Sequence, residues 1–382
     1  MSHAPTAALS ARHHTIRREL TARSLDALVV TALPNVLYLT NFTGSSAIVV
    51  VTQDALYFLT DFRYLTAIES ARGTAHECPG LELVTVKGSY DQTLAGLLAS
   101  LPIARVGFEA EHLTVSRYDW LGRTLPRGNT SGLELVPTEG IAARARLRKD
   151  DYEIATFREA ARRLSNVARR VPAEVRAGRS ELEVAIAIDF LIREAGFSKT
   201  SFDTIVAGGP NAALPHARPG ERRLCEGDLV VLDFGGVYDS YCVDLTRTVV
   251  VGQASSRVRE VYDAVLEAHD RAIASVKPGE SRFAIDAAAR DTLGRYGLAE
   301  AFGHGTGHGL GIEIHEDPKV TRKRPGDDVL GEDVTVAAGM IFTIEPGAYL
   351  PGWGGVRIED DVLVTADGVE VLTDVTTALI ET

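Results

Sequence analysis

Two aspartates occupy apolar, strand-like runs where a carboxylate is not expected. Asp233 follows the run 229–232, and Asp244 lies between Val243 and Leu245 in the segment that would pair with it. Aspartate is depleted in strands, and a buried carboxylate is costly unless it is paired or bound to a metal. The pair alone could equally be two aspartates at a turn or a strand end.

A glycine-rich segment at residues 302–311 carries two histidines. His304 and His308 are four residues apart among five glycines, and His315 follows four residues after Gly311. The spacing suits a helix but this glycine density does not, so we expect a loop whose backbone approaches a ligand closely. The segment contains no GxGxxG pattern, which argues against a nucleotide loop. A flexible surface loop with incidental histidines is the alternative.

Two glutamates each end an apolar run, Glu345 in IFTIEPGAY and Glu359 in GVRIEDD. An isolated glutamate at a strand end is usually solvated, but these two accompany two aspartates and a histidine. Four carboxylates that converge within a few ångströms cannot all ionise without cations. Two divalent ions would balance the charge. Oxygen-rich ligation with one histidine suits Mn²⁺, Co²⁺ or Fe²⁺, with Zn²⁺ possible.

The elements that must position these residues lie in the second part of the chain. Capping boxes that start at Asp150 and Ser180 begin two helices. A strand pair is expected at 228–236 and 241–251, with a turn at 239–240. Helices are then expected at about 256–276 and 281–296, and strands near Ile312 and at 340–345, 356–365 and 369–373. Two helices followed by a strand pair, twice over, indicate an internal pseudo-repeat of α+β units.

The first part of the chain alternates strand and helix signals. Apolar, β-branched runs predict buried strands at 27–32, 47–52, 56–59 and 81–86, and helices are expected at 16–24 and 92–100. This pattern indicates a smaller α/β domain with its own core. The basic stretch 143–151 has few apolar residues to bury, so we place the boundary there and expect domains of 1–143 and 144–382.

Length and composition limit the classes of function. A chain of 382 residues favours two domains, and a net charge of −12 argues against binding to nucleic-acid phosphates. The sequence contains neither an apolar run long enough for a membrane helix nor a signal-peptide core. Cys78, Cys225 and Cys242 form no CxxC pair, which argues against a disulfide framework and a zinc ribbon. We therefore expect a cytoplasmic protein without nucleic-acid or membrane partners.

The ordered set DFG…D, HGTGHGLG…H, EPG and RIED resembles the pita-bread metallopeptidases. This family includes Xaa-Pro dipeptidase (prolidase), aminopeptidase P, methionine aminopeptidase and creatinase. The segments LDALVVTALPNVLYLTNFTGSSA and LTDFRY resemble the creatinase-type N-terminal domain of prolidase and aminopeptidase P, which methionine aminopeptidases lack. The resemblance covers nearly the whole chain. It implies an α+β pita-bread catalytic domain that follows a smaller α/β N-terminal domain.

The resemblance assigns roles to the motif residues. Asp233 would chelate one metal, His308 and Glu345 would chelate the other, and Asp244 and Glu359 would bridge the two. A water between the ions would become hydroxide near neutral pH and attack the scissile carbonyl. Glu345 would carry the proton of that water to the leaving nitrogen.

Four further residues match family positions around the metals. His216 and His315 would face the substrate and stabilise the tetrahedral oxyanion. His304 and Arg357 would orient ligands or substrate. A plain loop histidine after Pro215 is the alternative for His216.

The resemblance implies hydrolysis of the bond before proline. That bond lacks the N–H that other peptidases grip, so a dedicated pocket is expected. The family builds this pocket partly from a partner subunit, which implies a homodimer. The substrate would be an Xaa-Pro dipeptide, as for prolidase, or a longer Xaa-Pro peptide, as for aminopeptidase P. We expect dipeptides to be cleaved at least as well, with Arg218 or Arg63 as candidates to bind their free carboxylate.

Two competing interpretations lie outside this peptidase activity. One is a metal-free, creatinase-like hydrolase of a small guanidino compound, and the other is a non-catalytic binding module. Relatives of both kinds typically lose metal ligands, whereas all five ligand positions are present in this chain.

Overall fold

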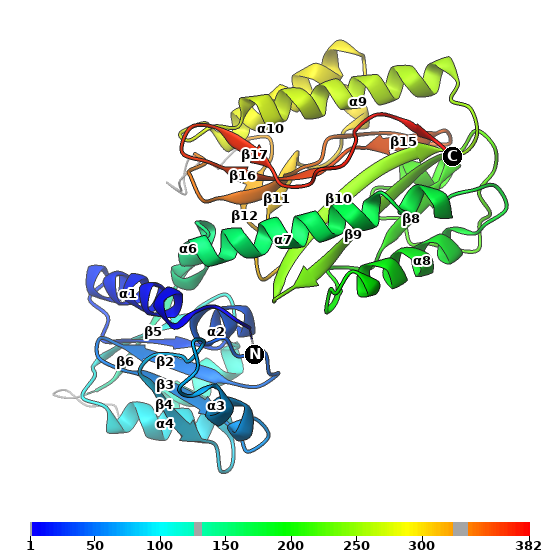
Figure 1. Ribbon diagram of the computed structural model, residues 1–382. Coiled ribbons are helices and arrows are strands. Elements are labelled where there is room, and N and C mark those ends of the chain that lie inside the picture. The colour runs from blue at the N-terminus through cyan, green and yellow to red at the C-terminus, as the bar shows by residue number, and fades with distance from the viewer. Residues whose placement is uncertain (1, 126–131, 324–334) are drawn as a thin grey trace. The chain divides into compact units, whose positions relative to one another are not determined.

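The computed structural model describes residues 2–125, 132–323 and 335–382 (Figure 1). The chain divides into two compact units, Met1–Arg146 and Leu147–Thr382. Within the described ranges, no helix is long and apolar enough to cross a membrane.

The N-terminal unit is built on a six-stranded sheet in the order β4-β3-β2-β1-β5-β6. The strands are β1 (Ala27–Val30), β2 (Ile48–Thr52), β3 (Leu56–Thr60), β4 (Leu81–Thr85), β5 (Arg105–Glu109) and β6 (Glu134–Thr138). The pairs β1–β2 and β2–β3 are antiparallel, and the other neighbours are parallel. The four strands expected from apolar runs are present, and this unit is the smaller α/β domain.

The helices of this unit differ more from expectation. They are α1 (Thr6–Ala22), α2 (Leu33–Thr40), α3 (Leu65–Ala71), α4 (Tyr90–Ser100) and α5 (Val115–Thr124). The first helix starts well before residue 16, because Arg12 and His13 fill buried positions and bond to the carbonyls of Tyr38 and Leu39. Apolar patterning cannot detect such polar residues. The expected polar connector, residues 143–151, also differs from the prediction. Residues 143–147 belong to helix α6 (Ile141–Leu147), and the side chains of Arg146 and Lys149 are buried.

The C-terminal unit contains two larger sheets. The first has the order β18-β10-β9-β7, with β8 also paired to β9. Its strands are β7 (Lys199–Thr200), β8 (Ile205–Gly208), β9 (Leu229–Tyr238), β10 (Tyr241–Val250) and β18 (Ile380–Glu381). The second has the order β12-β11-β13-β16-β17. Its strands are β11 (Gly307–Gly309), β12 (Glu316–Val320), β13 (Ile341–Ile344), β16 (Asp360–Val364) and β17 (Val369–Val371). A third sheet pairs β14 (Gly347–Leu350) with β15 (Gly354–Arg357).

Helices cover the outer sides of these sheets (Figure 1). They are α7 (Asp151–Ala168), α8 (Glu181–Glu194), α9 (Ser256–Ser275) and α10 (Arg282–Arg295), with short 3₁₀ turns η1 (Val171–Glu174), η2 (Gly209–Ala213) and η3 (Ala299–Ala301). One hydrophobic core joins α7 and α8 to β9 and β10, and another joins α9 and α10 to β13 and β16. Both predicted capping boxes are present, at Asp150 and Ser180. The α+β architecture expected for the second part of the chain is confirmed.

Two local expectations about the second sheet are wrong. The strand expected near Ile312 is absent from the described residues, and the glycine-rich segment forms β11 instead. A Cβ on Gly307 would lie 1.8 Å from the Thr343 carbonyl oxygen, and one on Gly309 would lie 2.0 Å from that of Asp317. These glycines therefore let neighbouring strands approach. The expected strand 356–365 is broken at Ile358 and Glu359 into β15 and β16, which belong to different sheets.

Candidate metal centre

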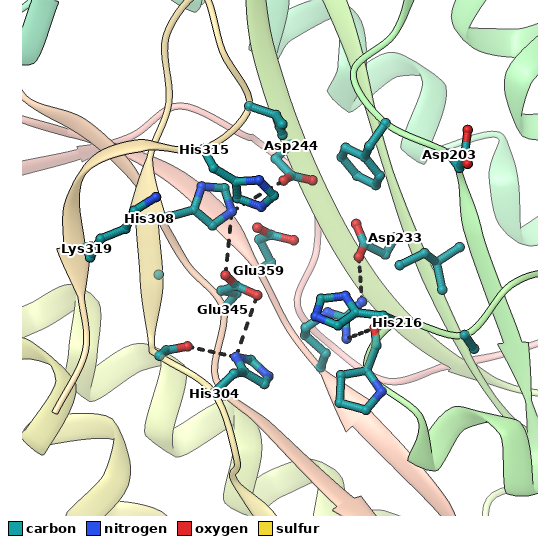
Figure 2. Close-up of a pocket in the computed structure, with 18 of the residues that line it drawn as sticks. Asp203, His216, Asp233, Asp244, His304, His308, His315, Lys319, Glu345 and Glu359 are labelled. Atoms are coloured by element: carbon teal, nitrogen blue, oxygen red, sulfur yellow. Dashed lines mark hydrogen bonds and ion pairs between the residues drawn. The ribbon is translucent and has the colours of Figure 1, made fainter. Parts of the chain in front are cut away.

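A cleft of about 680 Å³ opens in the C-terminal unit between the two larger sheets. The residues expected to bind metal or to act beside it all line the cleft: His216, Asp233, Asp244, His304, His308, His315, Glu345, Arg357 and Glu359. Figure 2 shows the carboxylates and His308 grouped in the cleft, with His216 near Asp233 and His304 below Glu345.

The β9–β10 hairpin places both aspartates on one face. Its turn residues Asp239 and Ser240 have φ values of 45° and 75°, as a two-residue hairpin turn requires. The register pairs Asp233 with Thr246, and Thr246 is two residues from Asp244. Because side chains alternate along a strand, all three point to the same side of the sheet. The hairpin interpretation of the two aspartates is thus correct.

The second sheet brings His308 and Glu345 to the aspartates. His308 lies in β11, and Glu345 directly follows β13, where its N–H donates to the Thr306 carbonyl at 2.7 Å. His308 Nε2 lies 3.7 Å from Glu345 Oε1 and 3.9 Å from Asp244 Oδ2. These distances leave space for a cation between the imidazole and the two carboxylates.

Glu359 completes the cluster from the break between β15 and β16. The Thr246 hydroxyl donates to Glu359 Oε2 at 2.6 Å and fixes the orientation of its carboxylate. Asp244, His308 and Glu359 each offer a ligand atom, and these atoms lie within 4.8 Å of one another. The break in the strand therefore serves to turn Glu359 toward the cleft.

Electrostatics favour a bound cation in this cluster. Burial, and then the charge of neighbouring carboxylates, raises the pKa of Asp244 and Glu359 well above ordinary values. Burial also raises the pKa of Glu345 to about 7. Asp233 Oδ1 is buried and accepts no hydrogen bond from the described residues. Buried carboxylates this close together fit divalent ions, which balance their charge and can fill a free acceptor position such as Asp233 Oδ1.

The histidine in the cluster is suited to be a ligand. Burial, together with the positive charges of His315 and Lys319, lowers the pKa of His308 to about 3. The imidazole is therefore neutral at physiological pH, which metal ligation requires. The His315 ring packs edge-on against it with centroids 4.3 Å apart. His216 and His315 are both exposed and line the cleft, so a substrate could reach them.

Arg357 and His304 are joined through Tyr349, a residue that the sequence did not point to. Arg357 is buried, and its Nη2 lies 2.5 Å from Asp233 Oδ2, while its Nη1 donates to the Tyr349 hydroxyl at 2.9 Å. Burial raises the pKa of Tyr349 to about 12, so the phenol keeps its proton. It can then donate to His304 Nε2 at 2.8 Å, which leaves the His304 proton on Nδ1, near the Gly305 carbonyl. A buried tyrosine needs a polar partner, but only the fold reveals which one.

Sequence reasoning missed Lys319, a charged residue beside the expected metal ligands. Lys319 in β12 lines the cleft and stands directly opposite His308 in the β11–β12 register (Figure 2). Its segment, EDPKV, shows no motif, and the pairing of β11 with β12 is what brings it to the site. Of the two expected arginines, Arg218 lines the cleft. Arg63 belongs to the N-terminal unit, where its guanidinium makes two 2.8 Å hydrogen bonds to Asp61.

Comparison with known proteins shows which family the chain matches. The profile of Metallopeptidase family M24 matches residues 155–366, and that of the Creatinase/Prolidase N-terminal domain matches residues 12–148. The chain is 38% identical over 349 residues to an uncharacterized peptidase of Bacillus subtilis, covering 91% of this chain and 94% of that protein.

Two solved structures share both domains with this chain. The Xaa-Pro dipeptidase from Bacillus anthracis superposes with a TM-score of 0.90 at 36% identity, covering 98% of this chain and 100% of the other. The X-Pro aminopeptidase from Thermotoga maritima superposes with a TM-score of 0.84 at 30% identity, covering 96% and 100%. The fold and family expected from the motifs are thus confirmed, and the chain belongs to Metallopeptidase family M24.

Proposed function

We propose that this protein is an Xaa-Pro dipeptidase that holds two divalent ions, with Mn²⁺ the expected metal. The observation that carries the proposal is the convergence of the five ligand side chains in one cleft. Their roles would be those expected from the motifs: Asp233 would hold one ion, His308 and Glu345 would hold the other, and Asp244 and Glu359 would be shared by both. A creatinase-like hydrolase or an inactive binding module would have no need of a complete set.

The protein side chains would divide the work of hydrolysis. When bound, the two ions supply Lewis acidity and lower the pKa of a water, so that a hydroxide nucleophile exists near neutral pH. Glu345 would take the proton of the attacking water and deliver it to the leaving proline nitrogen. His216 and His315 would stabilise negative charge on the carbonyl oxygen. Arg357 would hold Asp233 in place, and His304 would act beside Glu345.

Aminopeptidase P is the second candidate, because the chain is also similar to the X-Pro aminopeptidase from Thermotoga maritima. We favour the dipeptidase because the cleft wall carries cations that suit a free substrate carboxylate. Arg218 and Lys319 both line the cleft, whereas Asp61 already engages Arg63. The homodimer and the cytoplasmic location stay predictions.

Substrate length tests the proposal directly. With added Mn²⁺, Ala-Pro should be hydrolysed at least as fast as Ala-Pro-Ala, and Ala-Ala much more slowly. Mass spectrometry of the products measures all three rates under the same conditions. Much faster cleavage of Ala-Pro-Ala would make the enzyme an aminopeptidase P. Equal cleavage of Ala-Ala would refute proline specificity.

Lys319 should bind the C-terminal carboxylate of a dipeptide. Lys319→Met is expected to raise KM for Ala-Pro about 10- to 100-fold, since a hydrogen bond to a charged group contributes roughly 1.5–3 kcal/mol. KM for Ala-Pro-amide, which has no carboxylate, should not change. Lys319→Arg is the charge-conserving control. If Arg218→Met shows this pattern and Lys319→Met does not, the carboxylate site belongs to Arg218.

A further inference from the structure

A partly buried ion pair on helix α10 lies against the histidine segment that enters the metal centre. Asp286 is 1% exposed, and both of its oxygens accept from Arg290, one turn later, at 2.9 Å. The pair is bidentate and has i,i+4 spacing, so its geometry is rigid. Neither residue lines the cleft, and neither belongs to the sequence motifs.

The remaining donors of Arg290 hold the start of the histidine segment. Its Nη1 donates to the Phe302 carbonyl at 2.9 Å, and its Nη2 donates to the His304 carbonyl at 2.8 Å. Its guanidinium also lies 4.3 Å from the centre of the Phe302 ring, which in turn packs edge-on against His304. One side chain thus fixes two backbone carbonyls and the aromatic neighbour of His304.

Asp286 holds the next part of the same segment. Its Oδ1 accepts from the Thr306 hydroxyl at 2.9 Å and from the Thr306 N–H at 3.2 Å. The Thr306 carbonyl accepts from the N–H of Glu345 at 2.7 Å. The carboxylate of Asp286 is therefore connected through one residue to the backbone of a proposed metal ligand.

The segment needs such support, because its glycines give the chain little rigidity of their own. A buried ion pair is weak evidence for stability, since apolar residues of similar volume often do as well. The role of this pair is instead to position the segment, because its other hydrogen bonds are made with Phe302, His304 and Thr306. These contacts can fix the positions of His304, His308 and Glu345.

We propose that Asp286, Arg290 and Thr306 are positioning residues that orient the metal ligands His308 and Glu345 from behind the cleft. The proposal rests on the proposed function only in taking these two side chains as metal ligands. It requires the hydroxyl of Thr306, and not merely a side chain of its volume, because the hydroxyl makes the shorter of the two hydrogen bonds from Thr306 to Asp286. The Thr306 carbonyl then accepts from the N–H of Glu345.

Two substitutions of Thr306 separate positioning from packing. Thr306→Val keeps the volume but loses the hydroxyl, and it should weaken Mn²⁺ binding to the metal-free protein about 10- to 100-fold. Thr306→Ser keeps the hydroxyl but loses a methyl group, and it should bind Mn²⁺ nearly as wild type does. Because Thr306 is fully buried, a packing role predicts the opposite order. Isothermal titration calorimetry measures the affinities, and thermal unfolding reports stability separately.

A second comparison covers the case in which a Thr306 variant does not fold. Arg290→Lys keeps the charge beside Asp286 but cannot donate to both loop carbonyls, and should weaken Mn²⁺ binding about 10-fold. Arg295→Lys is its matched control on the same helix, where Arg295 forms an exposed pair with Glu267. The proposal would be overturned if Thr306→Val or Arg290→Lys bound Mn²⁺ with wild-type affinity. It would also be overturned if Thr306→Val and Thr306→Ser lost equal amounts of Mn²⁺ affinity. Wild-type protein that binds Mn²⁺ but cleaves no Xaa-Pro bond would refute the proposed function alone.

Discussion

Removal of divalent ions is expected to abolish hydrolysis of Ala-Pro, and two Mn²⁺ per chain should restore it. The physical reason is the buried cluster of Asp233, Asp244, Glu345 and Glu359, which brings together more carboxylates than its one paired cation, Arg357, can balance. Elemental analysis gives the stoichiometry, and activity is followed during titration of chelated, dialysed protein. The control is the same chelator already saturated with Mn²⁺. Full activity in protein that elemental analysis shows to be metal-free would contradict the two-ion site.

The stability of the metal-free protein should depend on pH because of the buried carboxylates in the cluster. In the metal-free fold, burial raises the pKa of Glu345 from 4.5 to about 7. A group with a raised pKa binds its proton more tightly in the folded state, so it lowers stability as pH rises from about 4.5 to 7. The Tm difference between metal-loaded and metal-free protein should therefore be larger at pH 8 than at pH 5. A difference that shrinks as pH rises would contradict this.

Glu345→Gln should reduce kcat about 100- to 10,000-fold at saturating Mn²⁺, because it removes both a proton carrier and a charged ligand. The fold should survive, since the bond from its N–H to Thr306 is made by the backbone. The side chains are similar in size, and the amide can still accept from the Thr343 hydroxyl, which lies 3.5 Å from Oε1. Steady-state kinetics with Ala-Pro, together with the Mn²⁺ affinity, measure the two losses separately.

Glu300→Gln is the matched control for this substitution. Glu300 is an exposed residue of η3 in the same unit and does not line the cleft, so its kcat should equal that of wild type. If Glu345→Gln retains wild-type kcat at saturating metal, Glu345 is not the proton carrier. If kcat returns to normal only as Mn²⁺ is raised far above the wild-type requirement, Glu345 acts as a ligand alone.

The sequence predicted well those helices and strands whose ends are marked by local capping or turn residues. The capping boxes at Asp150 and Ser180 mark helix starts because both hydrogen bonds of each box form within four residues. The hairpin turn at 239–240 was likewise readable from its residue types. Helix α2 was missed because Ala32, its N-cap, makes no side-chain hydrogen bond and the segment is almost wholly apolar. Its structure depends on packing rather than on a local signal.

The sequence by itself determined which residue types could form the site, because carboxylates in apolar runs require a buried charge partner. It also determined the order of the motifs, and with it the family. Only the tertiary structure decided how these residues meet: Thr246 bonds to Glu359 across 113 residues, and Arg357 bonds to Asp233 across 124. These contacts depend on the strand register and on the break between β15 and β16, and neither can be predicted from the residues nearby in the sequence. For the same reason Tyr349, Lys319 and the Asp286–Arg290 pair became visible only in the folded chain.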